Sequence, residues 1–229
     1  MGKILELKHI NKVYGDKVKN QVLFDVNLDF EESSFNSIIG QSGSGKSTLM
    51  NIIGTLDTPT SGQVLVNGND TSQMNKNELA VLRNETIGFI FQFHHLLPEF
   101  TVLENVLMPY RIMHNKVTQE ARDRAEYLID MVGLSKVKNN GSTEISGGQQ
   151  QRAAIARSLI NEPKLILGDE PTGNLDSDTT KIIFELLKDI NKELNTTFIL
   201  ITHDQKVAQQ TDRVIEIQDG HVGLDMQNM

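Results

Sequence analysis

The chain has 229 residues, enough for one well-buried domain, and we expect a single large α/β domain rather than two small ones. Its net charge of −8 has the wrong sign for a protein that tracks nucleic-acid backbones, and the absence of cysteine excludes disulfides, thiolate metal sites and cysteine catalysis. The apolar runs are short, and the N-terminus shows neither a signal-peptide pattern nor a myristoylation motif, so we expect no membrane span or lipid anchor.

The N-terminal quarter predicts strands, then a glycine loop and a helix. Residues 4–10 and 22–30 are typical of strands. The second alternates strictly, which predicts one buried face of an antiparallel layer, through Val22, Phe24, Val26, Leu28 and Phe30. Residues 35–40 predict a short buried strand entering the glycine loop, and the helix after that loop should end at Gly54.

In the rest of the chain, segments with the hydrophobic period of strands alternate with segments that have the period of helices. Residues 61–70 predict a hairpin strand, residues 75–83 a helix capped by Asn75, and residues 87–92 a buried strand. From about 94 to 160 the period is helical, with one helix from Thr118 to Gly133 and another starting at Ser146. Strands return at residues 164–171, 197–204 and 213–222, around a long helix at about 177–194.

Residues 40–48, GQSGSGKST, form a complete phosphate-binding motif. Gly40, Gly45, Lys46 and Ser47 occupy the fixed positions of GxxxxGK[ST]. The glycines let backbone N–H groups converge on phosphate oxygens, Lys46 reaches the outer phosphates and Ser47 can ligate Mg²⁺. A glycine-rich turn without a ligand is the alternative, but the position between a predicted strand and helix favours nucleotide binding.

Two adjacent carboxylates, Asp169 and Glu170, end the apolar stretch LILGDEP. Ligands of α/β folds bind at the carboxyl ends of strands, and successive residues point to opposite sides. We therefore expect Asp169 to hold Mg²⁺ and Glu170 to orient or deprotonate the attacking water. The alternative is a solvated acidic turn before Pro171.

His203 and Gln92 also follow predicted strands. His203 should lie near the γ-phosphate if its strand neighbours that of Glu170, although a lone histidine is often structural. Gln92 places a neutral amide where it can sense Mg²⁺ or water, and a simple polar strand end is its alternative.

Residues 144–152, EISGGQQQR, resemble half of a second phosphate site. Ser146 is a predicted helix cap followed by Gly147 and Gly148, which leaves N–H groups free for an anion. The segment lacks a lysine and a Mg²⁺ ligand, so it can complete a nucleotide site but cannot hold one alone. The phosphate it contacts should belong to another subunit's ATP, unless this is an ordinary serine-capped helix.

These motifs and their order resemble the ATP-binding cassette (ABC) transporter ATPases over essentially the whole chain. The matching residues are Tyr14, GQSGSGKS, Gln92, ISGGQ, LILGDEP, the NLD at 174–176 and His203. The resemblance implies a P-loop NTPase (RecA-like) core at about 1–92 and 160–229, with an antiparallel β subdomain. It also implies an inserted α-helical signature subdomain at about 93–159.

In that family two copies pack head to tail around two ATP molecules and drive a separate membrane permease from the cytoplasmic face of the membrane. The resemblance implies that Tyr14 stacks on adenine, Gln92 couples the site to the permease, and Asp176 links the two sites. Contacts to phosphates and Mg²⁺ would come from Gly40, Ser42, Gly43, Ser44, Gly45, Lys46, Ser47 and Thr48. Contacts to the other copy's γ-phosphate would come from Ser146, Gly147, Gly148 and Gln149. The catalytic set would be Glu170, His203 and Lys46, and the metal ligands Ser47, Gln92 and Asp169.

Three stretches resemble the branch that contains lipoprotein-releasing and macrolide-efflux ATPases, whose permeases act on substrates at or outside the membrane. They are residues 54–62, 93–109 and 170–176, and related peptide-resistance and cell-division ATPases share them. Permease docking is predicted for four apolar side chains that could equally be core, Leu96, Leu97, Phe100 and Leu103. Ile145 and Gly168 replace the commoner Leu and Ala, and we expect little loss from either change.

The alternative function is a soluble or cell-division-type ABC ATPase that remodels a protein complex without transporting a substrate. The long coiled coil or second cassette of several such proteins is absent from this sequence. A binding module with a degenerate ATPase is disfavoured by the intact Lys46, Asp169, Glu170 and His203.

Overall fold

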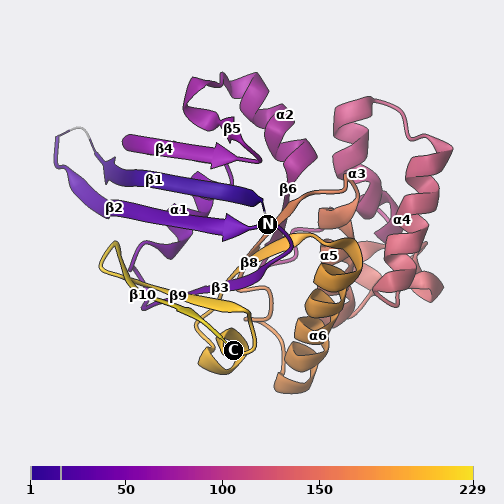
Figure 1. Ribbon diagram of the computed structural model, residues 1–229. Coiled ribbons are helices and arrows are strands. Elements are labelled where there is room, and N and C mark those ends of the chain that lie inside the picture. Colours follow the sequence, from indigo (N-terminus) through magenta and orange to yellow (C-terminus); the bar gives the residue numbers. More distant parts are fainter. Residues whose placement is uncertain (1, 16, 229) are drawn as a thin grey trace.

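Two β-sheets and a separate group of helices organise the fold in the computed structural model, which describes residues 2–15 and 17–228 (Figure 1). The strands are β1 (Lys3–Tyr14), β2 (Asn20–Glu31), β3 (Phe35–Ile39), β4 (Ser61–Val66), β5 (Asn69–Asp70), β6 (Ile87–Phe91), β7 (Leu165–Asp169), β8 (Thr197–Ile201), β9 (Arg213–Gln218) and β10 (His221–Gln227). The α-helices are α1 (Lys46–Ile53), α2 (Lys76–Thr86), α3 (Val102–His114), α4 (Gln119–Met131), α5 (Gly147–Leu159), α6 (Ser177–Leu194) and α7 (Gln205–Ala208).

The six-stranded sheet is the centre of the molecule. Its order is β10-β9-β3-β8-β7-β6, and all neighbours are parallel except the β9–β10 hairpin. Strands β3, β7 and β8 are therefore adjacent and point the same way. Their carboxyl ends meet at one edge of the sheet, where ligands of α/β folds bind.

Both faces of the central strands β3, β8 and β7 are covered, so these three strands are almost fully buried, whereas the edge strand β10 is mostly exposed. In β8, Phe198 and Leu200 join the core under α3 to α6, whereas Ile199 and Ile201 join the core around α1. Alternate residues of a strand point to opposite faces, so one apolar strand serves two cores. The second core also contains the inner face of the four-stranded antiparallel sheet, β2-β1-β4-β5.

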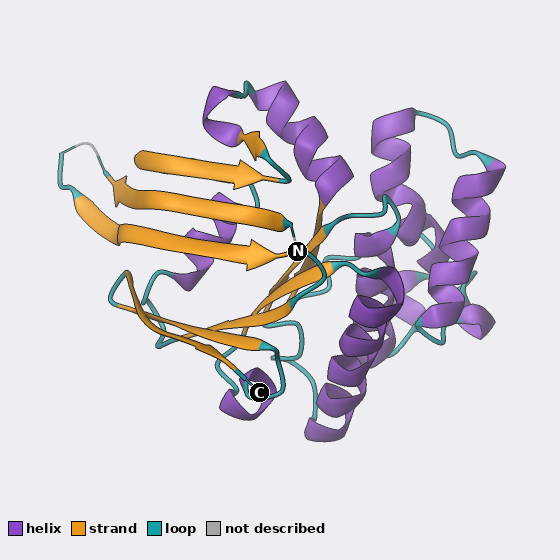
Figure 2. Cartoon of the chain, viewed as in Figure 1, coloured by secondary structure: helices purple, strands orange, loops and turns teal. Residues whose placement is uncertain are grey.

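The helices α3, α4 and α5 lie beside the parallel sheet, on the side away from the antiparallel layer (Figure 2). Capping boxes start two of them, at Thr101 with Glu104 and at Ser146 with Gln149. The predicted fold class, an α/β core with an antiparallel layer and an inserted helical subdomain, is confirmed. The predicted helix starts at Asn75, Thr118 and Ser146 and the helix end at Gly54 are also confirmed.

The predicted alternation along residues 22–30 is wrong in its first half. Leu23 is fully buried, and Phe24 is half-buried and stacks on His221 with ring centroids 4.7 Å apart. The reason is irregular pairing between β1 and β2: two of its register shifts flank Ile10, one adding a residue on β1 near His9 (φ 54°) and one on β2 near Asp25 (φ 47°). A bulge moves the side chains beyond it to the opposite face.

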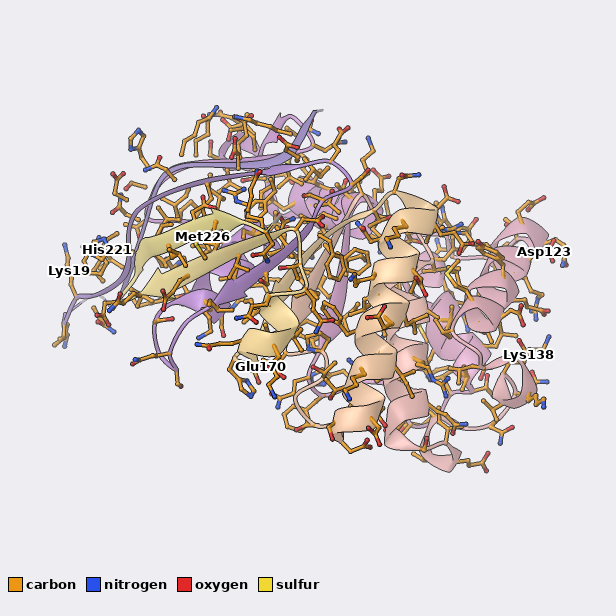
Figure 3. All side chains as sticks on the ribbon, turned by 60° about the horizontal axis from the view of Figure 1, so that its bottom comes forward. Lys19, Asp123, Lys138, Glu170, His221 and Met226 are labelled. Atoms are coloured by element: carbon orange, nitrogen blue, oxygen red, sulfur yellow. The ribbon has the colours of Figure 1, made fainter. Side chains whose placement is uncertain are left out.

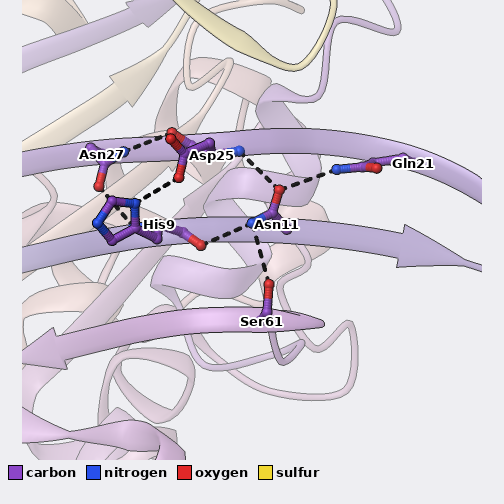
Figure 4. Close-up of polar contacts among 6 residues, drawn as sticks. All are labelled: His9, Asn11, Gln21, Asp25, Asn27 and Ser61. Atoms are coloured by element: carbon purple, nitrogen blue, oxygen red, sulfur yellow. Dashed lines mark hydrogen bonds and ion pairs between the residues drawn. The ribbon is translucent and has the colours of Figure 1, made fainter.

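A hydrogen-bond network holds the two bulges together (Figure 4). His9 Nδ1 lies 2.8 Å from Asp25 Oδ1, and the His9 backbone N–H donates to Asn27 Oδ1 at 2.8 Å. The Asp25 backbone N–H donates to Asn11 Oδ1 at 3.0 Å, and Asn11 in turn donates to Ser61 Oγ of β4. Side chains from β1, β2 and β4 therefore hold the two bulges in place.

Within the described parts of the chain, none of the helices combines the length and apolar character needed to span a membrane.

Candidate nucleotide site

The glycine loop after β3 has the backbone that phosphate binding requires. Gly43 and Gly45 have φ of +80° and +108°, values that side chains disfavour. A Cβ at Gly45 would also lie 2.9 Å from Leu23 Cδ2, whereas one at Gly43 would meet nothing within 4 Å. The loop is therefore packed against β2 on one side and open on the other, at the N-terminus of α1.

Lys46 is buried in this loop. Its Nζ donates to the carbonyl oxygens of Gly40 at 2.9 Å and Gln41 at 2.7 Å, which leaves a third ammonium hydrogen for an anion. Burial lowers the pKa of Lys46, and the charges of Glu170 and Asp169 act in the opposite direction. The amine is thus placed within the field of both carboxylates.

Ser44 supports a phosphate ligand for this loop. Its side chain is buried, and its hydroxyl has no hydrogen-bond partner among the described residues. Buried polar atoms are almost always satisfied, so an orphan hydroxyl in a glycine loop at the N-terminus of a helix fits an anion. Ser42 and Ser47 are exposed, and Thr48 is half-buried.

Asp169 and Glu170 lie next to this loop at the end of β7. Burial raises the pKa of Asp169, the neighbouring Glu170 raises it further, and Lys46 lowers it. Glu170 has φ of 46°, and its backbone N–H donates to Ile201 O at 2.9 Å. A left-handed conformation at a glutamate is uncommon and costs free energy, as is frequent at functional sites.

His203 lies directly beside Glu170, because β7 and β8 are neighbours. Its Nδ1 is 3.0 Å from Glu170 Oε1. An ionised carboxylate only accepts hydrogen bonds, so the histidine carries a proton on Nδ1 and donates it. The two side chains, 27 % exposed for Glu170 and 68 % for His203, border a groove of about 550 Å³. Figure 3 shows Glu170 at the surface beside α7 and the start of α6.

Gln92 approaches the same edge from β6. Its Nε2 donates to Asn174 Oδ1 at 3.2 Å, and Asn174 Nδ2 donates back to Gln92 O at 3.3 Å. A Cβ at Gly173 would lie 2.8 Å from Gln92 Nε2 and 3.2 Å from Glu170 Oε2. The structure therefore brings Gln92, Glu170 and His203 together around the 170–174 turn.

Residues 146–149, named the signature segment from here on, lie at the N-terminus of α5. Ser146 Oγ accepts from Gln149 N at 3.3 Å, and Gln149 Oε1 accepts from Ser146 N at 2.8 Å. A Cβ at Gly147 would meet nothing within 4 Å, and these residues border a groove of about 420 Å³. In the described part of the single chain, no hydrogen bond connects residues 146–149 with residues 40–48.

Asp176 caps α6 beside this groove. It accepts hydrogen bonds from the backbone of Asp178 and Thr179 and from Thr179 Oγ1, and these bonds lower its pKa. Its expected function as a link between two sites remains a prediction.

Tyr14 lies at the end of β1 and is 40 % exposed. Its hydroxyl donates to Asp57 Oδ2 at 2.7 Å, and Lys12 Nζ lies 4.7 Å from the ring centroid and 2.6 Å from Asp57 Oδ1. Burial and the hydrogen bond to Asp57 raise the pKa of Tyr14. The ring is thus fixed in place with part of its surface free.

Sequence reasoning missed Asp57 and Gln151. Asp57 lies in a loop distant in sequence from Tyr14 and carries no local signal. Gln151 is fully buried in α5 and contacts the ends of β6 and β7. A signal was available for it, because Gln151 shares a helical stripe with the buried Ile155 and Leu159, four and eight residues on.

Comparison with known proteins agrees with this geometry. The family model described as ABC transporter matches residues 23–173. The chain is 46 % identical over 224 residues to the lipoprotein-releasing system ATP-binding protein LolD 1 of Rhodopseudomonas palustris, covering 97 % of this chain and 99 % of that protein. LolD of Shewanella oneidensis is 46 % identical over 220 residues, covering 96 % and 95 %.

Solved structures give the same result. The ATP-binding cassette MJ0796, in a dimeric post-hydrolysis state bound to ADP and Pi, matches with a TM-score of 0.88 and 41 % identity, covering 98 % of this chain and 99 % of that chain. The cbiO1 protein of Clostridium perfringens, part of the ABC transporter complex cbiONQ, matches with a TM-score of 0.89 and 28 % identity, covering 100 % and 89 %. The chain therefore belongs to the ABC transporter family, as one of its ATP-binding domains.

Proposed function

We propose that the chain hydrolyses Mg-ATP as one of two copies in a head-to-tail dimer, and that closure of this dimer drives a membrane permease of the lipoprotein-releasing type. The observation that carries the proposal is the Glu170–His203 pair, 3.0 Å apart, at the same sheet edge as the Lys46 loop. The names of the LolD relatives support the lipoprotein-releasing branch.

The residues present fit a nucleotide with Mg²⁺. Lys46, the orphan Ser44 hydroxyl and the N-terminus of α1 suit phosphate oxygens. Ser47, Gln92 and Asp169 offer the oxygen ligands that Mg²⁺ prefers. When bound, Mg²⁺ neutralises phosphate charge and orients the phosphates for in-line attack.

Glu170 is proposed to accept a proton from the attacking water. Its Oε1 receives a hydrogen bond from His203, so His203 fixes the carboxylate and leaves Oε2 for the water. Oε2 would lie 3.2 Å from a Cβ at Gly173, so a side chain at that position would crowd the carboxylate. His203 thus orients the base, and Gly173 leaves space for it.

The signature segment is proposed to contact the γ-phosphate of the other copy. The first N–H groups of α5 have no partner within the helix, and Gly147 leaves the space above them open. Residues 146–149 include no Lys, Arg or His, and in the described structure they make no hydrogen bond to residues 40–48 of their own chain. A nucleotide held by one copy would therefore join the two chains.

A third groove, of about 510 Å³, is the proposed permease-docking surface. It lies between α2 and α3 and is lined mainly by apolar side chains. Ile112 is 71 % exposed at its edge, and Leu56 and Val81 are also exposed. An amphipathic helix of the permease fits such a groove, because its apolar face would pack against the apolar lining while its polar face stays in water.

The four predicted docking residues between 96 and 103 differ in exposure, and their function in docking stays a prediction. Leu103 is buried in the core, Leu96 and Phe100 are half-buried, and Leu97 is exposed. The buried amide of Asn105 fastens this segment to α3 through bonds to Leu97 N, Leu97 O and Phe100 O. We therefore place docking on the α2–α3 groove.

The test uses the Glu170→Gln chain, in which hydrolysis should be blocked and the closed dimer should accumulate. Mg-ATP should convert this variant from monomer to dimer in sedimentation experiments, and the additional change Ser146→Arg should prevent conversion. The trapped variant should also retain a polytopic membrane protein from solubilised native membranes, and Ile112→Glu should release it. A variant that dimerises but retains only soluble proteins would instead support the remodelling function.

A further inference from the structure

Gln151 is a fully buried polar side chain in the helix that starts at the signature segment. It is 0 % exposed, whereas its neighbours Gln149 and Gln150 are half-buried. The helical spacing directs it towards the core with Ile155 and Leu159. A neutral amide in this position has to find partners, because an unsatisfied buried polar group destabilises the fold.

Its partners come from three separate segments. Nε2 donates to Pro171 O at 2.5 Å and more weakly to Phe91 O at 3.4 Å, and Oε1 lies 2.5 Å from His94 Nδ1. Both carbonyls can only accept, which fixes the orientation of the amide with its nitrogen towards them. His94 must then donate, so its proton is on Nδ1.

These contacts flank two proposed site residues. Phe91 directly precedes Gln92, Pro171 directly follows Glu170, and both carbonyls bind the same amide nitrogen. The ends of β6 and β7 are already paired in the sheet, Phe91 with Asp169, so the Gln151 amide attaches this pair of strand ends to α5. An apolar residue at this position would fill the space but would remove these polar links between α5 and the strand ends.

Further along the same helix, Arg157 extends the connection. Its guanidinium donates to His94 O at 2.7 Å and to His95 O at 2.6 Å. Together, Gln151 and Arg157 attach the segment after Gln92 to α5. A displacement of α5 would thus be transmitted to Gln92 and Glu170 through fixed polar contacts.

We propose that Gln151 is a positioning residue for ATP hydrolysis: it holds the strand ends that carry Gln92 and Glu170 in register with the signature helix. This inference rests on the proposed function. It predicts an effect on turnover rather than on nucleotide affinity, because residues 40–48 make no hydrogen bond to Gln151 in the described structure. Displacements of about 1 Å at a reacting centre reduce rates by about 100-fold.

The kinetic test compares Gln151→Met with Gln150→Met. Methionine keeps the length of the side chain and removes its hydrogen bonds, and Gln150 is a matched control because its amide donates to Ser142 O, away from both strand ends. In Gln151→Met, kcat should fall by about 10- to 100-fold, with the Kd of a fluorescent ATP analogue changed by less than about twofold. Gln150→Met should retain the kcat of the wild type.

A second measurement is independent of hydrolysis. Long-range ¹H–¹⁵N NMR of the full chain should show His94 with its proton on Nδ1, and this signature should be lost in Gln151→Met. A proton on Nε2 in the wild type, or a folded Gln151→Met protein with unchanged kcat, would overturn the inference. A wild-type chain without ATPase activity would count against the proposed function alone, because the NMR experiment still tests the hydrogen bond between His94 and Gln151.

Discussion

Replacing Glu170 by glutamine removes one charge and almost no volume. The amide oxygen of the introduced glutamine can still accept the hydrogen bond from His203 Nδ1, so the 3.0 Å contact and the left-handed turn should survive. The lost property is the ability to take up a proton. The variant therefore separates the proposed general base from the architecture around it.

The expected size of the effect follows from general-base catalysis. Such a group contributes a factor of about 10² to 10⁴, and each factor of ten corresponds to about 1.4 kcal/mol of activation free energy, so the barrier should rise by roughly 3 to 5 kcal/mol. ATP affinity should not weaken, because removing a negative charge near the phosphates lowers electrostatic repulsion.

Phosphate release at saturating Mg-ATP measures turnover, and a fluorescent nucleotide measures binding. Glu185→Gln is the matched control, since Glu185 borders the same groove and undergoes the same chemical change without contacting His203. The control should keep the turnover of the wild type. If Glu170→Gln hydrolyses ATP within about threefold of the wild-type rate, the assignment of Glu170 as the base is wrong.

Three further predictions concern stability. Phe198→Ala removes a fully buried ring from β8 and should lower the free energy of unfolding by about 3–5 kcal/mol in urea denaturation. Thr101→Ala removes the cap of α3 and should cost about 1 kcal/mol in the same assay, with little effect on nucleotide binding. Burial alone would raise the pKa of Asp57, but hydrogen bonds from Lys12 and Tyr14 hold it below its usual 3.8. The ionised carboxylate of Asp57 therefore stabilises the fold at pH values above its usual pKa of 3.8, so Asp57→Asn should destabilise the protein at pH 7. The difference in urea midpoint should vanish as the pH falls through the depressed pKa of Asp57.

The sequence predicted the parts of the fold that depend on local pattern. Caps at Asn75 and Ser146, and the apolar strands after which Glu170 and His203 come, follow from side-chain chemistry within a few residues. The prediction that Glu170 and His203 lie close together depended on one condition, that β7 and β8 are neighbours in the sheet. The phosphate-binding motif around Lys46 could also be recognised from the sequence, because its glycines have fixed spacing and lie between a predicted strand and a predicted helix.

Features that depend on contacts between distant segments were out of reach. The alternation of β2 fails at Asp25 because β2 itself has an extra residue there, beside the bulge of β1 at His9, sixteen residues earlier. The helical stripe of Gln151 indicates that it is buried, but its partners Phe91, His94 and Pro171 come from distant segments that periodicity does not identify. Periodicity predicts which face a residue occupies on a regular element, and it has no information about where that element becomes irregular.

The unequal chemistry of the two phosphate-binding segments explains why neither is redundant. The loop at residue 46 has a cation, an open side at Gly43 and two carboxylates nearby, which suits the proposed binding of Mg-ATP within one chain. The signature segment has only helix N–H groups, which attract an anion weakly unless the anion is already held in place. Two chains that each carry a charge of −8 also repel one another. Closure of the proposed dimer should therefore depend on ATP as the bridge, and loss of the γ-phosphate would remove the contact that keeps the copies together.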